Sequence, residues 1–404
     1  MEELSISFVM PVYNEEAGIR NAIQRTLAVC ASIRKEVPGL KEVEFVVVND
    51  GSTDKTREIA GTFREIRLLN HTHNRGYGAA LKTGFAASRG TFIAFLDADG
   101  TYPPEQIPRL LRTALETNAD MALGSRFLGE KLRMPWLRQF GNHALAALLS
   151  WISGRKVTDT ASGMRVFKRD ILKTLHPLPD DLNLTPAMST LAVHQRMKII
   201  EVPIPYADRV GTSKLNLFRD GFRFLTTILY ITQFYNPLRF YGTVGSMLLL
   251  GGLLLGVGPL GHYVLYREIP DAQIHRLIAV LVLAVSGLNA IIFGMSTNYV
   301  LAVIRGYPLP WFTPTKRFPW RAYLAVLGFI LMCASILLYT RPLIGYLLRR
   351  PVVLHWSYTL TSAFLFLIGT QLVASCSLIS IFHALRAQTL LQNAKQTESS
   401  LHDG

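Results

Sequence analysis

Residues 90–100 read GTFIAFLDADG and join an apolar run to two acidic residues. The run is β-branched, aromatic or apolar on both faces, which is typical of a strand buried inside a parallel sheet. Such a strand would bring Asp97 and Asp99 to its carboxyl end, where ligands of open α/β sheets bind. Both carboxylates could reach one Mg²⁺, which takes one or two protein carboxylates and fills its other positions with water and phosphate oxygens. The sequence Asp-Ala-Asp-Gly is also common in plain turns, so a turn remains the alternative.

Strand and helix patterns alternate around this stretch. The expected strands are 5–12, 43–48, 68–69, 90–96, 120–124 and, at a sheet edge, 199–204. Helical patterns lie between them, and the one at 136–153 could be a core helix or lie in a membrane interface. The alternation predicts right-handed crossovers and an α/β fold with a mostly parallel sheet. Polar loops would then gather along one edge of that sheet.

Several of these loops carry groups that could bind a ligand. Glu15, Asp50 and Asp54 are acceptors for a base N–H or a ribose hydroxyl, although Asp54 could equally cap the following helix. Residues 76–78, Gly-Tyr-Gly, are a weak dinucleotide signature and are better interpreted as a helix start whose N–H groups can face phosphate. Lys82, one turn further on, would either reach that phosphate or be solvated.

The rest of the chain up to residue 235 adds two loops and one helix. Residues 159–165 are expected to form a loop with an acid and a base, and residues 209–214 a basic loop. Residues 215–235 carry apolar side chains at helical spacing with charges between them. This pattern predicts an amphipathic helix on the bilayer surface, with a domain-packing helix as the alternative.

The second half of the chain carries long apolar runs. Residues 240–266, 277–304, 322–340 and 351–385 contain no Asp, Glu, Lys or Arg. About 20 apolar residues cross a ~30 Å hydrocarbon core, so four membrane spans are predicted. The glycine and amide of 286–289 are repeated at 368–371, which suggests a duplicated hairpin.

Charge and the first residues indicate the orientation. The chain opens Met-Glu-Glu without a signal-peptide pattern, so the N-terminal part is expected to be cytoplasmic, and four spans return the tail to the same side. Basic residues between the second and third spans agree, whereas Arg341, Arg349 and Arg350 would lie outside and count against it. The net charge of +14 fits an anionic inner leaflet and phosphate ligands. Nucleic acid is the other partner of a basic chain, and the four spans argue against it.

The cysteines give no sign of a metal site or disulfide framework. Cys30, Cys333 and Cys376 have no CxxC spacing, and two of them lie in predicted spans. We expect reduced thiols that serve packing.

Seven motifs occur in an order that resembles glycosyltransferase family 2. They are residues 11–16, 49–54, 74–78, 97–99, 124–127, 162–165 and 201–214. The resemblance covers about residues 5–215 and is specifically to the dolichol-phosphate mannose synthase and polyprenyl-phosphate glucosyltransferase branch. It implies a GT-A fold that binds a nucleotide sugar, with inversion at the anomeric carbon.

The resemblance also assigns roles to residues by matching position. The nucleotide-sugar pocket would be lined by Pro11, Tyr13, Glu15, Asp50, Lys82, Asp97 and Ala98. Asp97 and Asp99 would bind Mg²⁺ or Mn²⁺. The catalytic residues would be Asp99, Arg126, Arg165, Arg209 and Lys214, and the acceptor phosphate would contact Arg126, Arg209, Ser213 and Lys214.

One departure from the family bears on the acceptor. Members of this branch commonly carry an acid in the helix near 185–189, and no acid lies between Asn183 and Lys198 here. A carboxylate there would serve as general base for a hydroxyl acceptor. A phosphate monoester has its second pKa near 6, so it is already anionic at pH 7 and needs cationic shielding instead.

These observations lead to one main hypothesis. The chain would transfer a single hexose from a UDP- or GDP-sugar to a polyprenyl phosphate at the cytoplasmic face of an inner or ER-like membrane, possibly as a homo-oligomer. The alternatives are transfer to a lipid hydroxyl, such as diacylglycerol, and a non-catalytic membrane scaffold. The expected domains are a GT-A domain at 1–214, an interfacial helix at 215–237, four transmembrane helices at 238–386 and a polar tail at 387–404.

Overall fold

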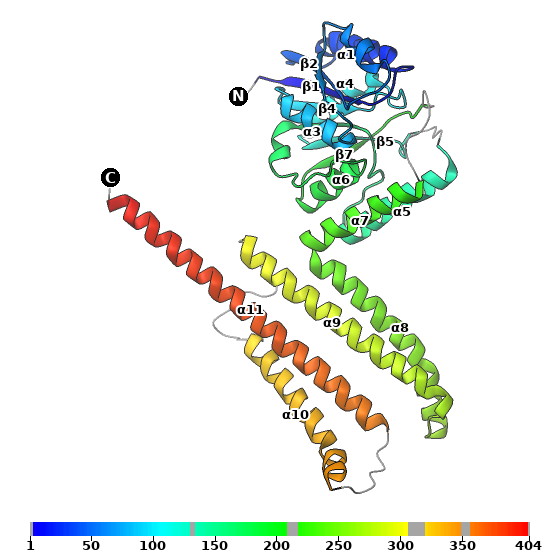
Figure 1. Ribbon diagram of the computed structural model, residues 1–404, viewed down its shortest axis with the longest axis vertical. Helices are drawn as coiled ribbons and strands as arrows, with labels where there is room; N and C mark the ends of the chain where they lie inside the picture. The colour runs from blue at the N-terminus through cyan, green and yellow to red at the C-terminus, as the bar shows by residue number, and fades with distance from the viewer. Residues whose placement is uncertain (1–2, 130–133, 208–216, 306–319, 349–355, 403–404) are drawn as a thin grey trace. The chain divides into compact units, whose positions relative to one another are not determined.

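The computed structural model describes residues 3–129, 134–207, 217–305, 320–348 and 356–402. The chain forms two compact units, Met1–Tyr235 and Asn236–Gly404, with the elements labelled in Figure 1. The first is an α/β unit and the second is all helical. The predicted fold class, a mostly parallel α/β sheet followed by four apolar helices, is confirmed.

A seven-stranded sheet forms the centre of the first unit, in the order β3-β2-β1-β4-β6-β5-β7. The strands are β1 (Ser5–Val12), β2 (Glu42–Asn49), β3 (Arg67–Asn70), β4 (Phe92–Leu96), β5 (Met121–Ser125), β6 (Met164–Lys168) and β7 (Ile199–Pro203). All neighbouring pairs are parallel except β4–β6 and β5–β6. The carboxyl ends of β1, β2 and β4 therefore meet at one edge, as the alternating pattern predicted.

Strand β6 corrects the expected loop at 159–165. The loop ends at Gly163, and Arg165 lies within an antiparallel strand inserted between β4 and β5. Its apolar side chains are buried on both faces because helices cover both sides of the sheet. A short strand of this kind shows no alternation by which it could be recognised.

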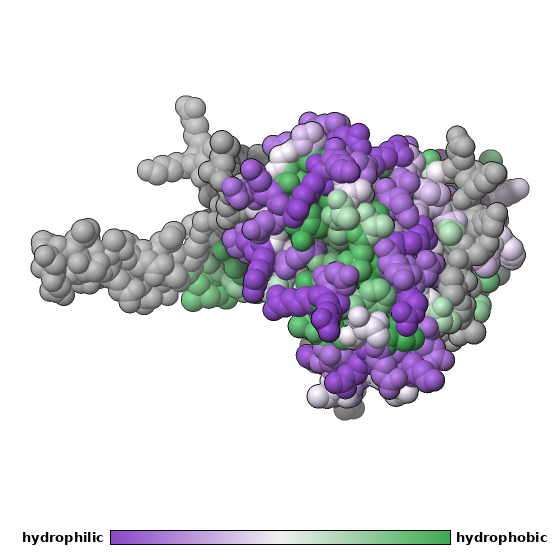
Figure 2. Space-filling view, turned by 90° about the horizontal axis from the view of Figure 1, so that it is seen from above, coloured by the Kyte–Doolittle hydropathy of each residue, from purple (hydrophilic) through white to green (hydrophobic). Residues whose placement is uncertain are grey.

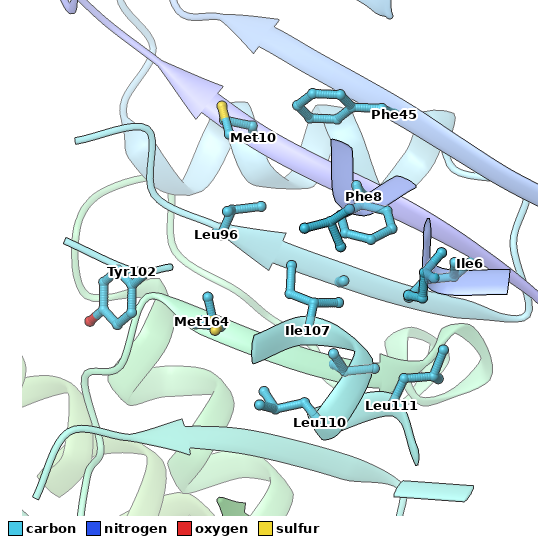
Figure 3. Close-up of a cluster of buried hydrophobic side chains, with 14 of the residues drawn as sticks. Ile6, Phe8, Met10, Phe45, Leu96, Tyr102, Ile107, Leu110, Leu111 and Met164 are labelled. Carbon is cyan, nitrogen blue, oxygen red and sulfur yellow. The ribbon is translucent and has the colours of Figure 1, made fainter. Parts of the chain in front are cut away.

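Helices cover both faces of the sheet and enclose two apolar clusters. The α-helices are α1 (Ile19–Glu36), α2 (Thr56–Gly61), α3 (Tyr77–Ala87), α4 (Ile107–Glu116), α5 (Trp136–Ser153), α6 (Leu184–His194) and α7 (Leu217–Tyr235), with 3₁₀ turns at Pro104–Gln106 and Arg169–Lys173. Successive strand residues point to opposite faces, so Phe8 packs against α1 and α4, and Val9 against α3 and α6. Figure 3 shows the first cluster, with Phe8 and Met10 of β1 close to Leu96 and to Ile107 of α4.

The surface contrasts with this interior. The face of the molecule shown in Figure 2 is mostly hydrophilic, with a smaller hydrophobic area near its middle.

Cys30 on α1 packs against the first cluster, and burial raises the pKa of its thiol to about 12. The thiol is therefore protonated at neutral pH, as a packing role requires.

The second unit consists of four long helices. They are α8 (Pro237–Tyr266), α9 (Ile274–Arg305), α10 (Trp320–Leu347) and α11 (Trp356–His402), with a 3₁₀ turn at Asp271–Gln273. All four are long and apolar enough to cross a membrane. Helix α8 packs against α9, α10 against α11, and α9 against α11 (Figure 1). Helix α11 continues to His402, through the residues expected to form the polar tail.

Candidate active site

A cavity of about 650 Å³ opens at the carboxyl edge of the sheet. Most of the predicted site residues line it, namely Pro11, Tyr13, Glu15, Asp50, Asp97, Ala98, Asp99 and Arg126. They come from the ends of β1, β2, β4 and β5, which lie far apart in the sequence. The topology of the sheet, rather than any local contact, brings these groups together.

Asp97 is held by two neighbours, Tyr77 and Gly163, that were not predicted as site residues. The Tyr77 hydroxyl donates a hydrogen bond of 2.6 Å to Asp97 Oδ1. Gly163 lies so close to the same carboxylate that a Cβ at this position would overlap it. The Gly163 N–H in turn donates a hydrogen bond of 2.8 Å to the Tyr102 hydroxyl, which fixes the loop against Asp97.

Asp99 is buried and anchored to the turn that follows β4. Its Oδ1 accepts hydrogen bonds from the Thr101 hydroxyl at 2.6 Å and from the Thr101 N–H at 3.1 Å. The neighbouring Tyr102 ring meets Tyr206 edge to face, with 5.5 Å between the ring centres. The stretch is therefore a turn, and its two carboxylates nevertheless line one cavity.

Asp50 organises the wall of the cavity at the end of β2. Its Oδ1 accepts hydrogen bonds from His71 Nδ1 at 2.7 Å and from the Arg75 N–H at 2.9 Å, and its Oδ2 accepts one from the Gly76 N–H at 2.9 Å. Because an ionised carboxylate only accepts hydrogen bonds, Nδ1 of His71 carries a proton. A carboxylate has about four acceptor sites in all, so Asp50 retains roughly one, on Oδ2.

Arg126 enters the cavity as one half of a buried ion pair. Its Nε and Nη2 each lie 2.7 Å from an oxygen of Asp159, which makes the pair bidentate. Glu201 of β7 holds the loop that carries Asp159, because it accepts hydrogen bonds from the Thr158 hydroxyl at 2.6 Å and the Thr158 N–H at 2.8 Å. The Arg126 guanidinium also lies 5.5 Å from the centre of the Tyr206 ring.

Two predicted cations do not reach the cavity, which corrects their assigned roles. Arg165 is fully buried and donates to the carbonyl oxygens of Ser162, Thr160 and Thr185. Burial lowers the pKa of its guanidinium to about 10, opposed by the nearby Asp159. Arg165 therefore stays charged at neutral pH and ties the loop before β6 to α6, behind the site.

Lys82 forms a surface ion pair and does not line the cavity. Its Nζ lies 2.6 Å from Asp180 Oδ1 and 2.9 Å from the Leu178 carbonyl oxygen.

Asp54 makes hydrogen bonds to nearby backbone groups. It accepts from the Thr56 N–H at the start of α2 and from the Glu16 N–H. Asp54 therefore stabilises the turn that leads into α2, whereas the N-cap residue of this helix is Lys55, which makes no side-chain cap hydrogen bond. Arg209, Ser213 and Lys214 lie outside the described residues.

The far wall of the cavity comes from two helices that sequence reasoning left undecided. Helix α5 contributes Leu137, Arg138, Phe140 and Asn142, and α7 contributes Phe218, Arg219, Asp220, Arg223 and Phe224. Leu149 of α5 and Ile228 of α7 share one buried cluster, so the two helices pack together. On the side away from this buried cluster, each helix exposes aromatic side chains, among them Trp136 and Phe222. In the sequence, the part of α5 after Arg138 has no charged residue, which was the signal for this wall. The signal did not indicate which side of the helix faces the domain.

A divalent cation fits the chemistry of the two aspartates at the sheet edge. Among the described residues, no group of three or more His, Cys, Asp and Glu side chains gathers to form a metal cage. Asp97 and Asp99 supply hard oxygen donors on one cavity wall. A pair of carboxylates is the usual protein share of a Mg²⁺ site that is completed by water and substrate phosphates.

Comparison with known proteins agrees with this site. Residues 7–175 match the model of glycosyl transferase family 2, and residues 237–393 match a domain of unknown function (DUF8752). The low-salt glycan biosynthesis hexosyltransferase Agl6 of Haloferax volcanii is 33% identical over 76% of this chain and 73% of its own. The dolichyl-phosphate hexose transferase of the same organism is 34% identical over 54% of this chain and 89% of its own.

A bacterial relative and a solved structure extend the comparison. The undecaprenyl-phosphate 4-deoxy-4-formamido-L-arabinose transferase of Photorhabdus laumondii is 31% identical over 62% of this chain and 75% of its own. The glucosyl-3-phosphoglycerate synthase of Mycobacterium tuberculosis, solved with Mn²⁺, UDP and phosphoglyceric acid, is 22% identical over 57% of this chain and 78% of its own, with a TM-score of 0.46.

The first unit has a mostly parallel sheet with carboxylates at its carboxyl edge, and it matches glycosyl transferase family 2. It is a glycosyltransferase domain of the GT-A class. The chain belongs to glycosyltransferase family 2.

Proposed function

We propose that the chain transfers one hexose from a UDP-sugar to a polyprenyl phosphate at the cytoplasmic face of a membrane. One observation carries the proposal: a single cavity is lined both by the carboxylates of the sheet edge and by the apolar and cationic side chains of α5 and α7. The names of two relatives, a dolichyl-phosphate hexose transferase and an undecaprenyl-phosphate 4-deoxy-4-formamido-L-arabinose transferase, support the same acceptor class.

The α5 and α7 wall suits an acceptor with an apolar tail and an anionic head. Phe140 is 69% exposed and Phe218 is 81% exposed, although both line the cavity. Side chains of this kind on amphipathic helices favour the boundary between water and acyl chains. Arg138 and Arg219 line the cavity beside them, where their cationic heads could shield a lipid phosphate.

The sheet-edge residues would handle the donor. Asp97 and Asp99 would hold Mg²⁺ or Mn²⁺, and the bound ion would stabilise the charge that develops on the leaving diphosphate. Tyr77 and Gly163 keep the Asp97 carboxylate in one position. Arg126, fixed by Asp159, adds a buried positive charge to the same wall. Attack by the acceptor phosphate from the face opposite the diphosphate would invert the anomeric carbon.

The hydrogen bonds of Asp50 favour uracil over guanine. Three of about four acceptor sites of this carboxylate are already used by His71, Arg75 and Gly76. The N3–H of uracil needs one acceptor, whereas the adjacent N1–H and N2–H of guanine would need both carboxylate oxygens. Asp50 therefore suits a uridine nucleotide.

A lipid hydroxyl is the second candidate acceptor, because two carboxylates of the kind that can serve as a general base line the cavity. Asp181 and Asp220 line the cavity although α6 carries no acid. Asp181 is 3.2 Å from Arg223, and Asp220 is 3.4 Å from Arg219, so both are held beside a cation. Each carboxylate is therefore already engaged in an ion pair within the domain. A phosphate acceptor, which needs no base, fits this arrangement better.

The test is transfer of label from UDP- and GDP-hexoses into organic-extractable lipid by the purified full chain. Polyprenyl phosphate and diacylglycerol are offered separately, each with and without EDTA. We expect EDTA-sensitive label in the polyprenyl product from a UDP-sugar. Label only in diacylglycerol would move the acceptor to a hydroxyl, and donor binding without any transfer would favour the non-catalytic scaffold.

A further inference from the structure

The four apolar helices contain a sequence repeat, and the proposed transfer reaction does not account for it. Aligning Pro237 with Trp320, the first residues of α8 and α10, brings Gly245 onto Gly328. The same alignment brings Pro259 onto Pro342, Leu260 onto Leu343 and Tyr263 onto Tyr346. A glycine and a Pro-Leu-x-x-Tyr sequence thus recur at the same positions of the two helices.

The second helices of the two pairs align in the same way. Placing Ile274 on Trp356, the first residues of α9 and α11, brings Gly287 onto Gly369 and Leu283 onto Leu365. It also brings the amide of Asn289 onto that of Gln371. No gap is needed within either helix.

The aligned glycines make the same contact in both hairpins. A Cβ placed on Gly245 would lie 2.5 Å from the Gly287 carbonyl oxygen, and one on Gly287 would lie 2.8 Å from the Gly245 carbonyl oxygen. In the second hairpin, a Cβ on Gly328 would lie 2.8 Å from the Gly369 oxygen, and one on Gly369 would lie 2.6 Å from the Gly328 oxygen. Each hairpin is therefore closed by a reciprocal glycine crossing, which lets two helix backbones approach closely.

A second contact, two helical turns away, repeats the register. In the first hairpin a Cβ on Gly252 would lie 3.5 Å from the carbonyl oxygen of Val280. The aligned residues of the second hairpin are Ser335 and Ser362, whose hydroxyls each donate to the other's carbonyl oxygen at 2.8 Å and 3.0 Å. The backbones face each other at equivalent positions, and only the side chains differ.

The two hairpins differ in one informative place, the side of α9 away from its glycine crossing. Ser296 and Tyr299 are each 4% exposed there, whereas the aligned Leu378 and Ile381 of α11 are 43% and 57% exposed. Polar side chains in a membrane helix are kept against other helices, and apolar ones face lipid. Helix α9 packs against α11 as well as against α8, and the side of α9 that carries Ser296 and Tyr299 is buried.

We propose that α8–α9 and α10–α11 are two copies of one helical hairpin, and that the second copy serves as the partner covering the polar side of α9. The interaction surface is the Ser296 and Tyr299 side of α9, and its partner is a second hairpin of the same construction. The equivalent side of α11 carries Leu378 and Ile381 and faces lipid, so the array ends after two hairpins.

The shared register is tested by disulfide formation in the full chain, in membranes, after Cys30→Ser, Cys333→Ala and Cys376→Ala. The paired variants are Gly252→Cys with Val280→Cys and Ser335→Cys with Ser362→Cys. We expect both to cross-link on mild oxidation, as seen by mass spectrometry of linked peptides. Matched controls move one cysteine of each pair to the exposed neighbour, with Leu253→Cys or Ile336→Cys, and should lose the cross-link. Cross-linking in only one hairpin, or equally in the controls, would overturn the common register.

The covering role is tested by spin labels and oxygen dissolved in the bilayer. Labels at Ser296→Cys and Leu378→Cys occupy aligned positions, and the same holds for Tyr299→Cys and Ile381→Cys. We expect oxygen to relax the α11 labels strongly and the α9 labels weakly. Equal accessibility within each pair would show that α9 is not covered and would refute the proposed partner. Neither readout depends on the donor or acceptor, so failure here leaves the proposed function standing.

Discussion

The hydroxyl of Tyr77 lies 2.6 Å from Asp97 Oδ1 and donates a hydrogen bond to it. Burial raises the pKa of Tyr77 well above its usual value, and the adjacent Asp97 acts in the same direction. The phenol therefore keeps its proton throughout the neutral range and remains a donor. A fixed donor of this kind orients one of the two carboxylates proposed to hold the metal.

Tyr77→Phe keeps the ring and removes only this donor. Loss of a partner behind a metal ligand typically costs about 10- to 100-fold in metal affinity. We expect Mn²⁺ to bind correspondingly more weakly in the presence of UDP, as followed by electron paramagnetic resonance. Tyr102→Phe is the comparison: it removes the acceptor of the Gly163 N–H but keeps the Tyr77 donor to Asp97, so it should weaken Mn²⁺ binding less. Unchanged Mn²⁺ affinity in Tyr77→Phe would contradict the positioning role.

Asp99→Asn should lower the rate of transfer strongly while leaving the fold intact. The amide keeps an oxygen that can accept from Thr101, but it removes a negative charge from the proposed metal site. Loss of one electrostatic contact in a preorganised site lowers turnover by about 10²- to 10³-fold. The measurement is the transfer rate at saturating Mn²⁺, with thermal unfolding as the check on folding. Retained turnover would exclude Asp99 from metal binding.

The buried pair of Arg126 and Asp159 predicts an effect on stability. Asp159→Ala would leave the guanidinium buried without its bidentate partner, which typically costs about 3–5 kcal/mol. The double variant Arg126→Met with Asp159→Leu removes both charges and should recover much of that loss. Thermal unfolding of the purified chain measures both. A single variant as stable as the parent would show that the pair contributes little to folding.

The sequence was informative where the topology of a parallel sheet fixes the outcome. Asp50, Asp97 and Asp99 follow strands of the parallel part, and the carboxyl ends of such strands meet at one edge whatever the rest of the chain does. Arg165 follows a different rule, because β6 runs antiparallel and its buried side chain points behind the site. Nothing within the motif Ser-Gly-Met-Arg specifies that reversal.

Contacts between distant segments were the second obstacle. Lys82 pairs with Asp180, and Arg126 pairs with Asp159, which lie in loops whose positions depend on the completed fold. The helical pattern of α7 was visible, but its two sides are both apolar. Ile228 faces the domain and Phe218 is exposed, so amphipathicity alone could not assign one helix face to one environment.

The hydrogen bonds of Asp50 predict the choice of nucleotide. UDP should bind more tightly than GDP in a calorimetric titration of the full chain with Mn²⁺ present. Asp50→Asn removes a charged acceptor, and a hydrogen bond to a charged group contributes about 1.5–3 kcal/mol, so UDP affinity should fall by roughly 10- to 100-fold. GDP binding as tight as UDP would refute the proposed uridine specificity, even if hexose transfer is confirmed.

The exposed aromatic residues of α5 and α7 predict how the acceptor's tail is recognised. Phe140→Ser and Phe218→Ser remove apolar surface that lines the cavity, and full burial of a phenylalanine contributes about 1.5–3 kcal/mol. We expect a higher KM for long-chain polyprenyl phosphate and little change for a short-chain, water-soluble analogue. Trp151→Ser and Tyr230→Ser are the matched controls, since these side chains are 56% and 68% exposed on the same two helices but do not line the cavity. Equal losses in all four variants would mean that the helices anchor the domain to the membrane without selecting the acceptor.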